Sequence, residues 1–383
     1  MKKIAYNKQF VDKSDINIVS KALKNNFITG GSYVKNLELK LSKFLKVKFT
    51  TTCINGTAGL DIAFRSINLS NRDVIIMPVV NFIASYSMAD KLNAKIYLAD
   101  VDPTTGQMTP KTLLDCIKKN KIKKIKAIVT MYLGGYPENI DEFFRIKKKY
   151  NFLIIEDACH ALGSRYEINN KKYMVGSCKH ADISVFSFHP VKTITTAEGG
   201  LVTTNNKKID DKAKKIRNHN ILRGKKYWDY DIKNLSLNYR LSDINCALGI
   251  TQLKKINLFI KNRKNSYFYY KKYIKDLSNN ISLPSYKSFK NASYHLFLIN
   301  VNFESIKSSK DKLFEYLNKK NIFPQFHYKP LYMFSFYGKN KDNFSGAKKY
   351  YNNTLSLPLF YKIKKKEQNY IIKHLRYFLN KKN

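Results

Sequence analysis

The first two thirds of the chain alternate between short apolar runs and amphipathic stretches, and this alternation limits the fold more than any other feature of the sequence. It is typical of an α/β domain, in which strands and the helices that cover them follow one another. The expected helices include residues 57–66, 110–119 and 140–150. The expected strands are residues 73–77, 95–98, 127–131, 152–155, 183–188 and 201–204.

Most of these strands are expected to be buried on both faces. Residues 152–155 read Phe-Leu-Ile-Ile, without the polar residue at every second position that a solvent-facing strand shows. One connection differs, because the dozen residues between Phe188 and Leu201 hold Pro190 and two glycines where a parallel crossover would usually place a helix. We therefore predict an antiparallel return at this point, and a mixed, mostly parallel sheet.

The length of 383 residues exceeds that of a typical single domain, so two domains are expected. Beyond Leu241 the pattern changes. The elements expected there are a long helical stretch (242–274), strands at 294–302 and 323–327, and helices at 311–318 and 365–379. We expect a large domain over residues 1–250 with an N-terminal arm, and a smaller α+β domain over residues 251–383.

Several classes of protein are disfavoured by what the sequence lacks. No stretch approaches the roughly 18 apolar residues of a membrane span, and residues 1–15 show no apolar signal-peptide core, so a cytoplasmic location without membrane insertion is expected. The five cysteines include no C-x-x-C pair and the histidines no H-E-x-x-H motif, so neither a disulfide framework nor a metal site is predicted. The G-x-G-x-x-G fingerprint is also absent, which disfavours a dehydrogenase.

The net charge of +42 is the most unusual feature of the composition. A field of this size attracts polyanions, so a basic nucleic-acid-binding or surface-binding protein is the alternative from outside the enzymes. The lysines, however, form short scattered runs such as 123–124, 147–149 and 364–366, and no nucleic-acid-binding motif accompanies them. We interpret them as a solvated surface that can help to attract an anionic substrate, and predict no nucleic-acid partner.

A carboxylate and an imidazole are expected at the edge of the sheet. Glu156 and Asp157 end a buried strand, and His160 follows shortly after them. The carboxyl edge of an α/β sheet is where such folds bind ligands. Asp157 can equally be the cap of a following helix, a common use of Asp after a strand. These residues alone leave both interpretations open.

The segment 184–200 is more informative, because it places Lys192 on a turn directly after a buried strand. A lysine that is partly removed from water loses its proton more readily and can form an imine with an aldehyde. Ser187 before it and the pair Gly199-Gly200 after it offer hydroxyl and backbone donors for an anion. A single lysine in so basic a protein is usually a surface charge, and the whole segment is what argues for chemistry here.

Residues 152–205 resemble the core signature of the DegT/StrS-type sugar-nucleotide aminotransferases. Further segments match this family in order: residues 28–31 (I-T-G-G), 55–60 (N-G-T-A-G-L), 78–84 and 238–243 (N-Y-R-L-S-D). The resemblance covers nearly the whole chain. It implies pyridoxal 5′-phosphate (PLP) as the cofactor and PLP fold type I, the aspartate aminotransferase-like fold, with a mixed, mostly parallel sheet in the large domain and a smaller α+β domain.

The resemblance also implies a role for each residue around the cofactor ring. Lys192 would be the catalytic lysine, which binds PLP as a Schiff base and later carries a proton between substrate carbon and cofactor. Asp157 would pair with the protonated pyridine nitrogen, which makes the ring an electron sink. Phe82 would stack on the ring, and His160 would place a polar group beside the ring oxygen.

The cofactor phosphate would be held by several donors. The resemblance assigns to it the helix start at Gly56, with the amides of Thr57 and Ala58, and the hydroxyl of Ser187. In the family, the asparagine that corresponds to Asn238 reaches a phosphate in the neighbouring subunit. The resemblance therefore implies a homodimer with active sites shared across the interface.

Within the family, the chain is most similar to the branch that transfers an amino group from L-glutamate to C4 of a UDP-linked 4-keto-6-deoxy-N-acetylhexosamine in pseudaminic acid biosynthesis. The segments that carry this likeness are residues 188–192 (F-H-P-V-K), Trp228-Asp229, residues 327–332 (H-Y-K-P-L-Y) and residues 334–337 (F-S-F-Y). His189, His327 and Tyr328 are the residues expected to contact the UDP-keto-sugar. The structural alternative is that the aromatic segment is simply a packed edge of the small domain.

Two enzyme alternatives remain open at this stage. A C3-keto nucleotide-sugar aminotransferase of the same family shares all the cofactor residues and differs only in its substrate contacts. A dehydratase branch also resembles the family, but it replaces the lysine with histidine, and Lys192 is present here.

Overall fold

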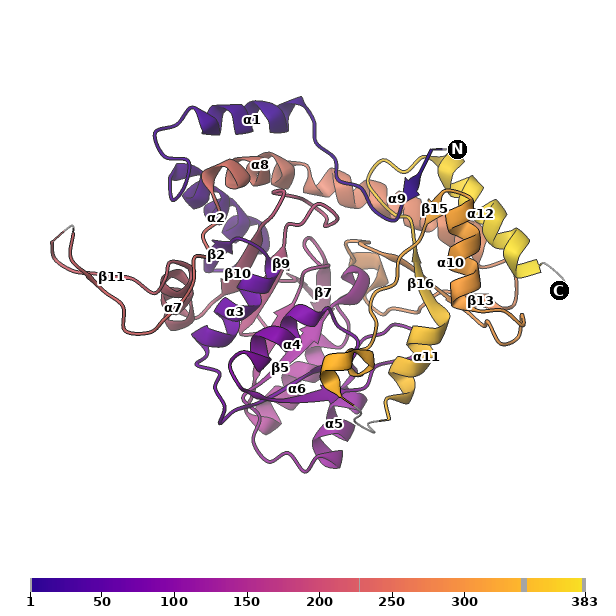
Figure 1. The fold of residues 1–383 in the computed structure, drawn as a ribbon, viewed down its shortest axis with the longest axis horizontal. Coiled ribbons are helices and arrows are strands. Elements are labelled where there is room, and N and C mark those ends of the chain that lie inside the picture. The colour runs from indigo at the N-terminus through magenta and orange to yellow at the C-terminus, as the bar shows by residue number, and fades with distance from the viewer. Residues whose placement is uncertain (1, 227, 339–342, 381–383) are drawn as a thin grey trace.

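A seven-stranded sheet lies at the centre of the protein, in a computed structural model that describes residues 2–226, 228–338 and 343–380 (Figure 1). Its strand order is β2-β10-β9-β6-β5-β3-β4. The strands are β2 (Phe49–Cys53), β3 (Val74–Pro78), β4 (Lys95–Ala99), β5 (Ala127–Met131), β6 (Leu153–Asp157), β9 (Ile183–Ser187) and β10 (Gly200–Thr204). The helices of this part are α2 (Ser32–Leu45), α3 (Gly56–Ser66), α4 (Ile83–Asp90), α5 (Pro110–Lys119), α6 (Ile140–Tyr150) and α7 (Lys207–Arg217).

The sheet is mixed, as predicted. Strands β4, β3, β5, β6 and β9 run parallel to one another, whereas β10 pairs antiparallel with both β9 and β2. The antiparallel return expected between Phe188 and Leu201 is therefore confirmed. Every residue of β5 and β10 is buried, which agrees with strands covered on both faces. Strand β2 was not predicted from the sequence.

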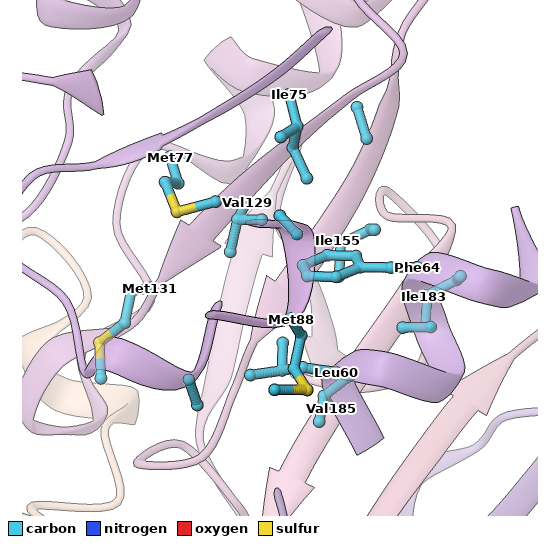
Figure 2. Close-up of a cluster of buried hydrophobic side chains, with 14 of the residues drawn as sticks. Leu60, Phe64, Ile75, Met77, Met88, Val129, Met131, Ile155, Ile183 and Val185 are labelled. Atoms are coloured by element: carbon cyan, nitrogen blue, oxygen red, sulfur yellow. The ribbon is translucent and has the colours of Figure 1, made fainter. Parts of the chain in front are cut away.

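One face of the sheet is covered by α3 and α4. Figure 2 shows Leu60 and Phe64 of α3 and Met88 of α4 in a cluster that also contains Val129 of β5 and Ile155 of β6, and all five side chains are buried. Each such side chain stabilises the fold by about 1.5–3 kcal/mol when it is fully buried. This packing fixes α3, and with it the start of the helix at the carboxyl edge of the sheet.

Three of the elements expected in the second part of the chain differ in the structure. The strand expected over 294–302 is shorter, β14 (Phe297–Val301). The helical stretch expected over 242–274 is two helices, α8 (Asp243–Lys254) and α9 (Ile256–Ile274), which meet at Lys255. The strand expected over 323–327 is reduced to β15 (Ile322–Phe323). Pro324 follows it directly and has no N–H to donate to a strand partner, and beyond it only Gln325 forms a single bridge, to Ser356.

The rest of this part forms a small sheet with helices beside it. The strands are β13 (Ile281–Ser282), β14 (Phe297–Val301) and β16 (Thr354–Leu357), and the helices are α10 (Lys310–Lys319), α11 (Ser345–Asn353) and α12 (Lys365–Asn380). The predicted helices at 311–318 and 365–379 are thus confirmed. The division into domains 1–250 and 251–383 stays a prediction, and its boundary would fall inside α8.

The N-terminal segment crosses the molecule (Figure 1). Strand β1 (Ile4–Ala5) pairs with β15 beside the small sheet, and α1 (Lys13–Leu23) packs against α8. Two hairpins complete the fold. They are β7 (Arg165–Ile168) with β8 (Lys171–Met174), and β11 (Leu222–Arg223) with β12 (Tyr230–Asp231), which projects from the body in Figure 1. Among the described residues, no helix is both long and apolar enough to span a membrane.

Candidate active site

A cavity of about 540 Å³ opens at the carboxyl ends of β5, β6 and β9, beside the start of α3. The residues predicted for the site that line it are Gly56, Thr57, Phe82, Asp157, His160, Ser187, His189, Lys192, His327 and Tyr328. They come from positions spread over more than two thirds of the chain, and the fold brings them to one place. Ala58 and Asn238 do not line the cavity.

Lys192 lies on the turn after β9, where its backbone N–H donates to His189 O (2.9 Å). Removal from water lowers the pKa of Lys192, although the nearby Cys159 and Asp157 oppose this effect. A lowered pKa leaves a larger fraction of the amine unprotonated at neutral pH than on an exposed lysine. Lys192 is therefore suited to attack a carbonyl carbon and to accept a proton.

Asp157 ends β6 with its carboxylate toward the cavity. It is 3% exposed, and it accepts from the Ser85 hydroxyl (3.3 Å) and the Cys159 N–H (3.3 Å). Burial raises the pKa of Asp157, while hydrogen bonds from Cys159 and the charge of Lys192 lower it. No helix follows β6 before β7 in the chain, so the helix-cap interpretation of Asp157 is wrong. A buried carboxylate with only long hydrogen bonds is suited to a cationic partner.

Glu156, the neighbouring carboxylate, points to the opposite face of the strand. It accepts from the Ser184 hydroxyl (2.5 Å), the Tyr132 hydroxyl (2.8 Å) and the Gly176 N–H (3.3 Å). These three donors satisfy the hydrogen-bonding capacity of the Glu156 carboxylate without a ligand. Of the two adjacent acids, Asp157 is the one that faces the cavity.

The start of α3 provides an anion site. Asn55 caps this helix by accepting from the Ala58 N–H (2.8 Å), so the Ala58 amide predicted for the phosphate already has an acceptor. The amides of Gly56 and Thr57 lie in the first turn, where helix N–H groups have no intrahelical acceptor. A Cβ on Gly56 would lie 3.1 Å from Ser187 Cβ, so glycine is what keeps this cradle open. The sequence prediction missed Asn55, although Asn before a helix is a recognised cap signal.

His160 organises one wall of the cavity. Its Nδ1 accepts from the Gly134 N–H (3.3 Å) and its Nε2 lies 2.9 Å from the Tyr328 hydroxyl. Burial lowers the pKa of His160 well below its usual range, so the ring is neutral. A neutral ring that accepts at Nδ1 carries its proton on Nε2, which then donates to the Tyr328 oxygen. The Tyr328 hydroxyl is left free to donate its own proton to a group in the cavity.

Two further histidines complete a neutral wall. His295 is 1% exposed, its ring centroid lies 4.2 Å from that of His160, and the sequence prediction missed it. His327 bonds Ser356 Oγ through Nδ1 (2.8 Å), and burial lowers its pKa to about 3. Among the described residues, no group of His, Cys, Asp and Glu is arranged to hold a metal ion.

Aromatic rings lie at the mouth of the cavity. Phe82 is 50% exposed, an unusual exposure for a phenylalanine, and its ring centroid lies 5.7 Å from that of Tyr328. Tyr6, from the N-terminal segment, also lines the cavity and was missed by the sequence prediction. His189 is exposed at the rim. These rings provide flat apolar surfaces for a ring-shaped ligand.

Asn238 is exposed and lies outside the cavity of its own chain. Its Oδ1 accepts from the Arg240 N–H (3.2 Å), and its backbone bridges to Asn218. Its predicted use by a neighbouring subunit stays a prediction.

The donor set fits PLP. Lys192 can bind an aldehyde, and the buried Asp157 can pair with a protonated ring nitrogen. The amides at the start of α3, together with Ser187, can hold a phosphate, because a helix N-terminus favours an anion. Phe82 offers an apolar face for the ring.

The family model of the DegT/DnrJ/EryC1/StrS aminotransferases matches residues 9–376. The chain is 38% identical over 371 residues to the UDP-4-amino-4,6-dideoxy-N-acetyl-beta-L-altrosamine transaminase of Campylobacter jejuni strain 81-176, covering 96% of this chain and 95% of the relative. It is 31% identical over 365 residues to the Helicobacter pylori protein of the same name, covering 94% and 93%.

Solved structures give the same assignment. The Helicobacter pylori PseC aminotransferase, involved in the biosynthesis of pseudoaminic acid, is 28% identical and covers 99% of both chains with a TM-score of 0.89. A putative sugar aminotransferase from Streptococcus pneumoniae in its PLP form is 26% identical and covers 98% of both chains with a TM-score of 0.88. The chain therefore belongs to the DegT/DnrJ/EryC1/StrS aminotransferase family and is a PLP-dependent sugar aminotransferase.

Proposed function

We propose that this protein transfers the amino group of L-glutamate to C4 of a UDP-linked 4-keto-6-deoxy-N-acetylhexosamine, a step of pseudaminic acid biosynthesis. The observation that carries the proposal is the meeting of Lys192 and the buried Asp157 in one cavity beside a helix N-terminus. The choice of sugar is supported by likeness to the Campylobacter transaminase along 96% of the chain.

Lys192 has two tasks in the proposed reaction. Its Nζ would hold the cofactor, and in its neutral form it would remove the proton from the amine-bearing carbon of glutamate. It delivers a proton in the reverse direction when the keto-sugar is aminated. PLP, when bound, supplies a ring that withdraws electrons from the carbon that loses its proton. The lowered pKa of Lys192 favours the neutral form that this proton transfer requires.

The other residues bind and orient. Asp157 would provide the negative charge that favours a protonated ring nitrogen when the cofactor is bound. The neutral His160 holds Tyr328 with its hydroxyl proton available to the cavity. Because His295 and His327 are also kept neutral by burial, the wall presents hydrogen-bonding groups without adding charge.

The direct test is the product formed from candidate UDP-keto-sugars and ¹⁵N-labelled glutamate, analysed by NMR. We expect ¹⁵N on C4 of the 4-keto-6-deoxy-N-acetylhexosamine. Label on C3 of a 3-keto substrate instead would assign the protein to the alternative branch of the family. Failure to aminate any UDP-keto-sugar would refute the proposal.

We further propose a homodimer in which Asn238 of each subunit reaches the cofactor phosphate of the other. A phosphate with nearly two negative charges needs several donors, and in one chain the start of α3 and Ser187 supply only part of them. Asn238 is exposed and does not line the cavity of its own chain, so its side chain is available to contact a second subunit.

Mixing two impaired variants tests this sharing. Lys192→Ala and Asn238→Ala are each expected to lose most turnover, and Asn238→Ala to retain PLP poorly while it stays folded. In a hybrid dimer, one of the two sites receives both an intact lysine and an intact asparagine. Random exchange in an equal mixture should restore about a quarter of wild-type activity, because half the dimers are hybrids and each has one complete site.

The matched control for the mixing experiment uses the Lys192→Ala/Asn238→Ala double variant with wild type. Hybrids of that pair contain no complete site if the asparagine is shared. If hybrids form and wild-type subunits within them keep full activity, each chain holds a complete site and the sharing is wrong.

A further inference from the structure

Arg263 of α9 is a buried cation that has no anionic partner among the described residues. It is 2% exposed, and its guanidinium donates to Leu359 O (3.0 Å), His295 O (3.3 Å) and Asn7 Oδ1 (3.1 Å). Its Nε has no acceptor, and no carboxylate forms an ion pair with it among residues 2–226, 228–338 and 343–380. Burying a guanidinium on neutral acceptors alone is costly, so the free energy of this arrangement depends on the three hydrogen bonds that Arg263 donates.

The three acceptors of Arg263 belong to segments that are far apart in the sequence and meet behind the cavity. Asn7 belongs to the N-terminal arm, which we define as residues 2–12. His295 precedes β14 and lines the cavity, and Leu359 follows β16. One guanidinium therefore joins the N-terminal arm to two segments of the small sheet.

The arm carries Tyr6 into the cavity. The Tyr6 ring lies 5.4 Å from that of His327, and its backbone O accepts from the Leu359 N–H (2.9 Å). The arm is otherwise held by the two-residue strand β1 (Ile4–Ala5), whose pairing alone is weak, and by Phe10, whose backbone O accepts from Gln252 Nε2 (2.8 Å). Asn7, which contacts Arg263, thus directly follows Tyr6, the residue of the arm that lines the cavity.

We propose that Arg263 is a positioning residue, which holds the N-terminal arm through Asn7 so that the Tyr6 ring forms the wall on which the sugar of the substrate packs. This inference rests on the proposed function, because it assigns the wall to the nucleotide-sugar. A tyrosine ring offers both the flat apolar face and the hydroxyl that a sugar ring can contact. Arg263 also helps to lower the pKa of His295, which keeps that side of the wall neutral.

The contact can be weakened and strengthened at Asn7. Asn7→Ala removes the acceptor, whereas Asn7→Asp gives the guanidinium a carboxylate. Asn7 Nδ2 and Arg263 Nε are both buried without an acceptor. Asn7→Asp replaces the Nδ2 donor by a carboxylate oxygen, which can accept from Arg263 Nε. In the purified protein without substrate, amide hydrogen exchange over residues 2–12 should be about tenfold faster in Asn7→Ala and Arg263→Gln, and as slow as wild type or slower in Asn7→Asp.

Steady-state kinetics then test whether the arm contributes to binding of the UDP-keto-sugar. Asn7→Ala and Tyr6→Ala are expected to raise KM for the UDP-keto-sugar about tenfold with a smaller change in kcat. Conversion of the bound cofactor by glutamate alone, followed by its absorbance, should stay close to wild type. Asn7→Asp should restore a near-wild-type KM, a rescue that general loss of stability would not give.

Lys362→Gln is the matched control. This exposed lysine also contacts the arm, with its Nζ 4.1 Å from the centre of the Phe10 ring, and its removal should leave exchange and KM unchanged. Equal exchange in Asn7→Ala, Asn7→Asp and wild type would overturn the proposal, as would faster exchange without a change in KM for the sugar. If wild type itself shows no reaction with glutamate, the proposed function fails instead, and the exchange data still decide whether Arg263 holds the arm.

Discussion

Replacing Lys192 by alanine is expected to reduce turnover by about 10³-fold or more, because one change removes both the Schiff-base amine and the group that transfers the proton. The protein should stay folded. Lys192 is only half-buried and lies on a turn, and no hydrogen bond or ion pair of its side chain holds the surrounding elements together in the described structure. Steady-state turnover with glutamate and the UDP-keto-sugar, beside a thermal melt, measures both expectations.

Lys179→Ala is a suitable control for that experiment, since Lys179 is exposed and does not line the cavity. It should retain wild-type turnover. If Lys192→Ala were folded and nearly as active as this control, another lysine would have to carry the chemistry.

Asp157→Asn is expected to reduce turnover by about 10²- to 10³-fold, the scale on which loss of one preorganised electrostatic partner acts in an active site. The amide keeps the shape of the side chain and can still accept from Ser85 and Cys159, but it has no charge to keep the ring nitrogen protonated. PLP should still bind, since Lys192 and the start of α3 are unchanged. Cofactor content and single-turnover rate separate these two effects.

The matched control is Asp141→Asn, an acid-to-amide change on the solvent face of α6. Its turnover should match wild type. Activity of Asp157→Asn within a few-fold of that control would mean that Asp157 acts only through the local turn that it makes with Cys159.

Much of the central sheet could be predicted because its strands are continuous apolar runs. Strand β2 has no such run, and its sequence is Phe-Thr-Thr-Thr-Cys. Its threonines are buried because they find partners from distant elements. Thr50 donates to Glu38 O (2.9 Å), Thr51 to Asp210 (3.1 Å) and Thr52 to the Glu38 carboxylate (2.9 Å). A local pattern cannot report burial that depends on tertiary hydrogen bonds.

The division of the helical stretch 242–274 also could not be predicted. The apolar spacing continues through Lys255, where α8 ends and α9 begins. Lys255 Nζ is held there by Asp12 (3.0 Å) and Asp15 (2.5 Å) from the N-terminal segment. The break itself is in the backbone of Lys255, which has φ −94° and ψ −2°. The spacing of the apolar residues does not change there, so periodicity could not indicate the division.

In the site too, residues on regular elements or on the turn that follows one could be predicted, whereas residues on irregular segments could not. Asp157 and Ser187 could be predicted because they are the last residues of β6 and β9, and Lys192 because it lies on the turn that follows β9. Tyr6 and His295 could not, because each enters the cavity from an irregular segment. His295 follows Tyr294, whose φ of 54° turns the chain just before β14, in a stretch expected to be a strand.

The central claim is that Lys192 binds PLP and that glutamate supplies the amino group. Borohydride reduction of the PLP-loaded protein, followed by peptide mass spectrometry, tests it most directly. We predict one pyridoxyl group on Lys192. It should be lost when glutamate is added before reduction, since the cofactor then carries the amine, and it should return when the UDP-keto-sugar follows. A label spread over other lysines, or one on Lys192 that glutamate does not remove, would contradict this account.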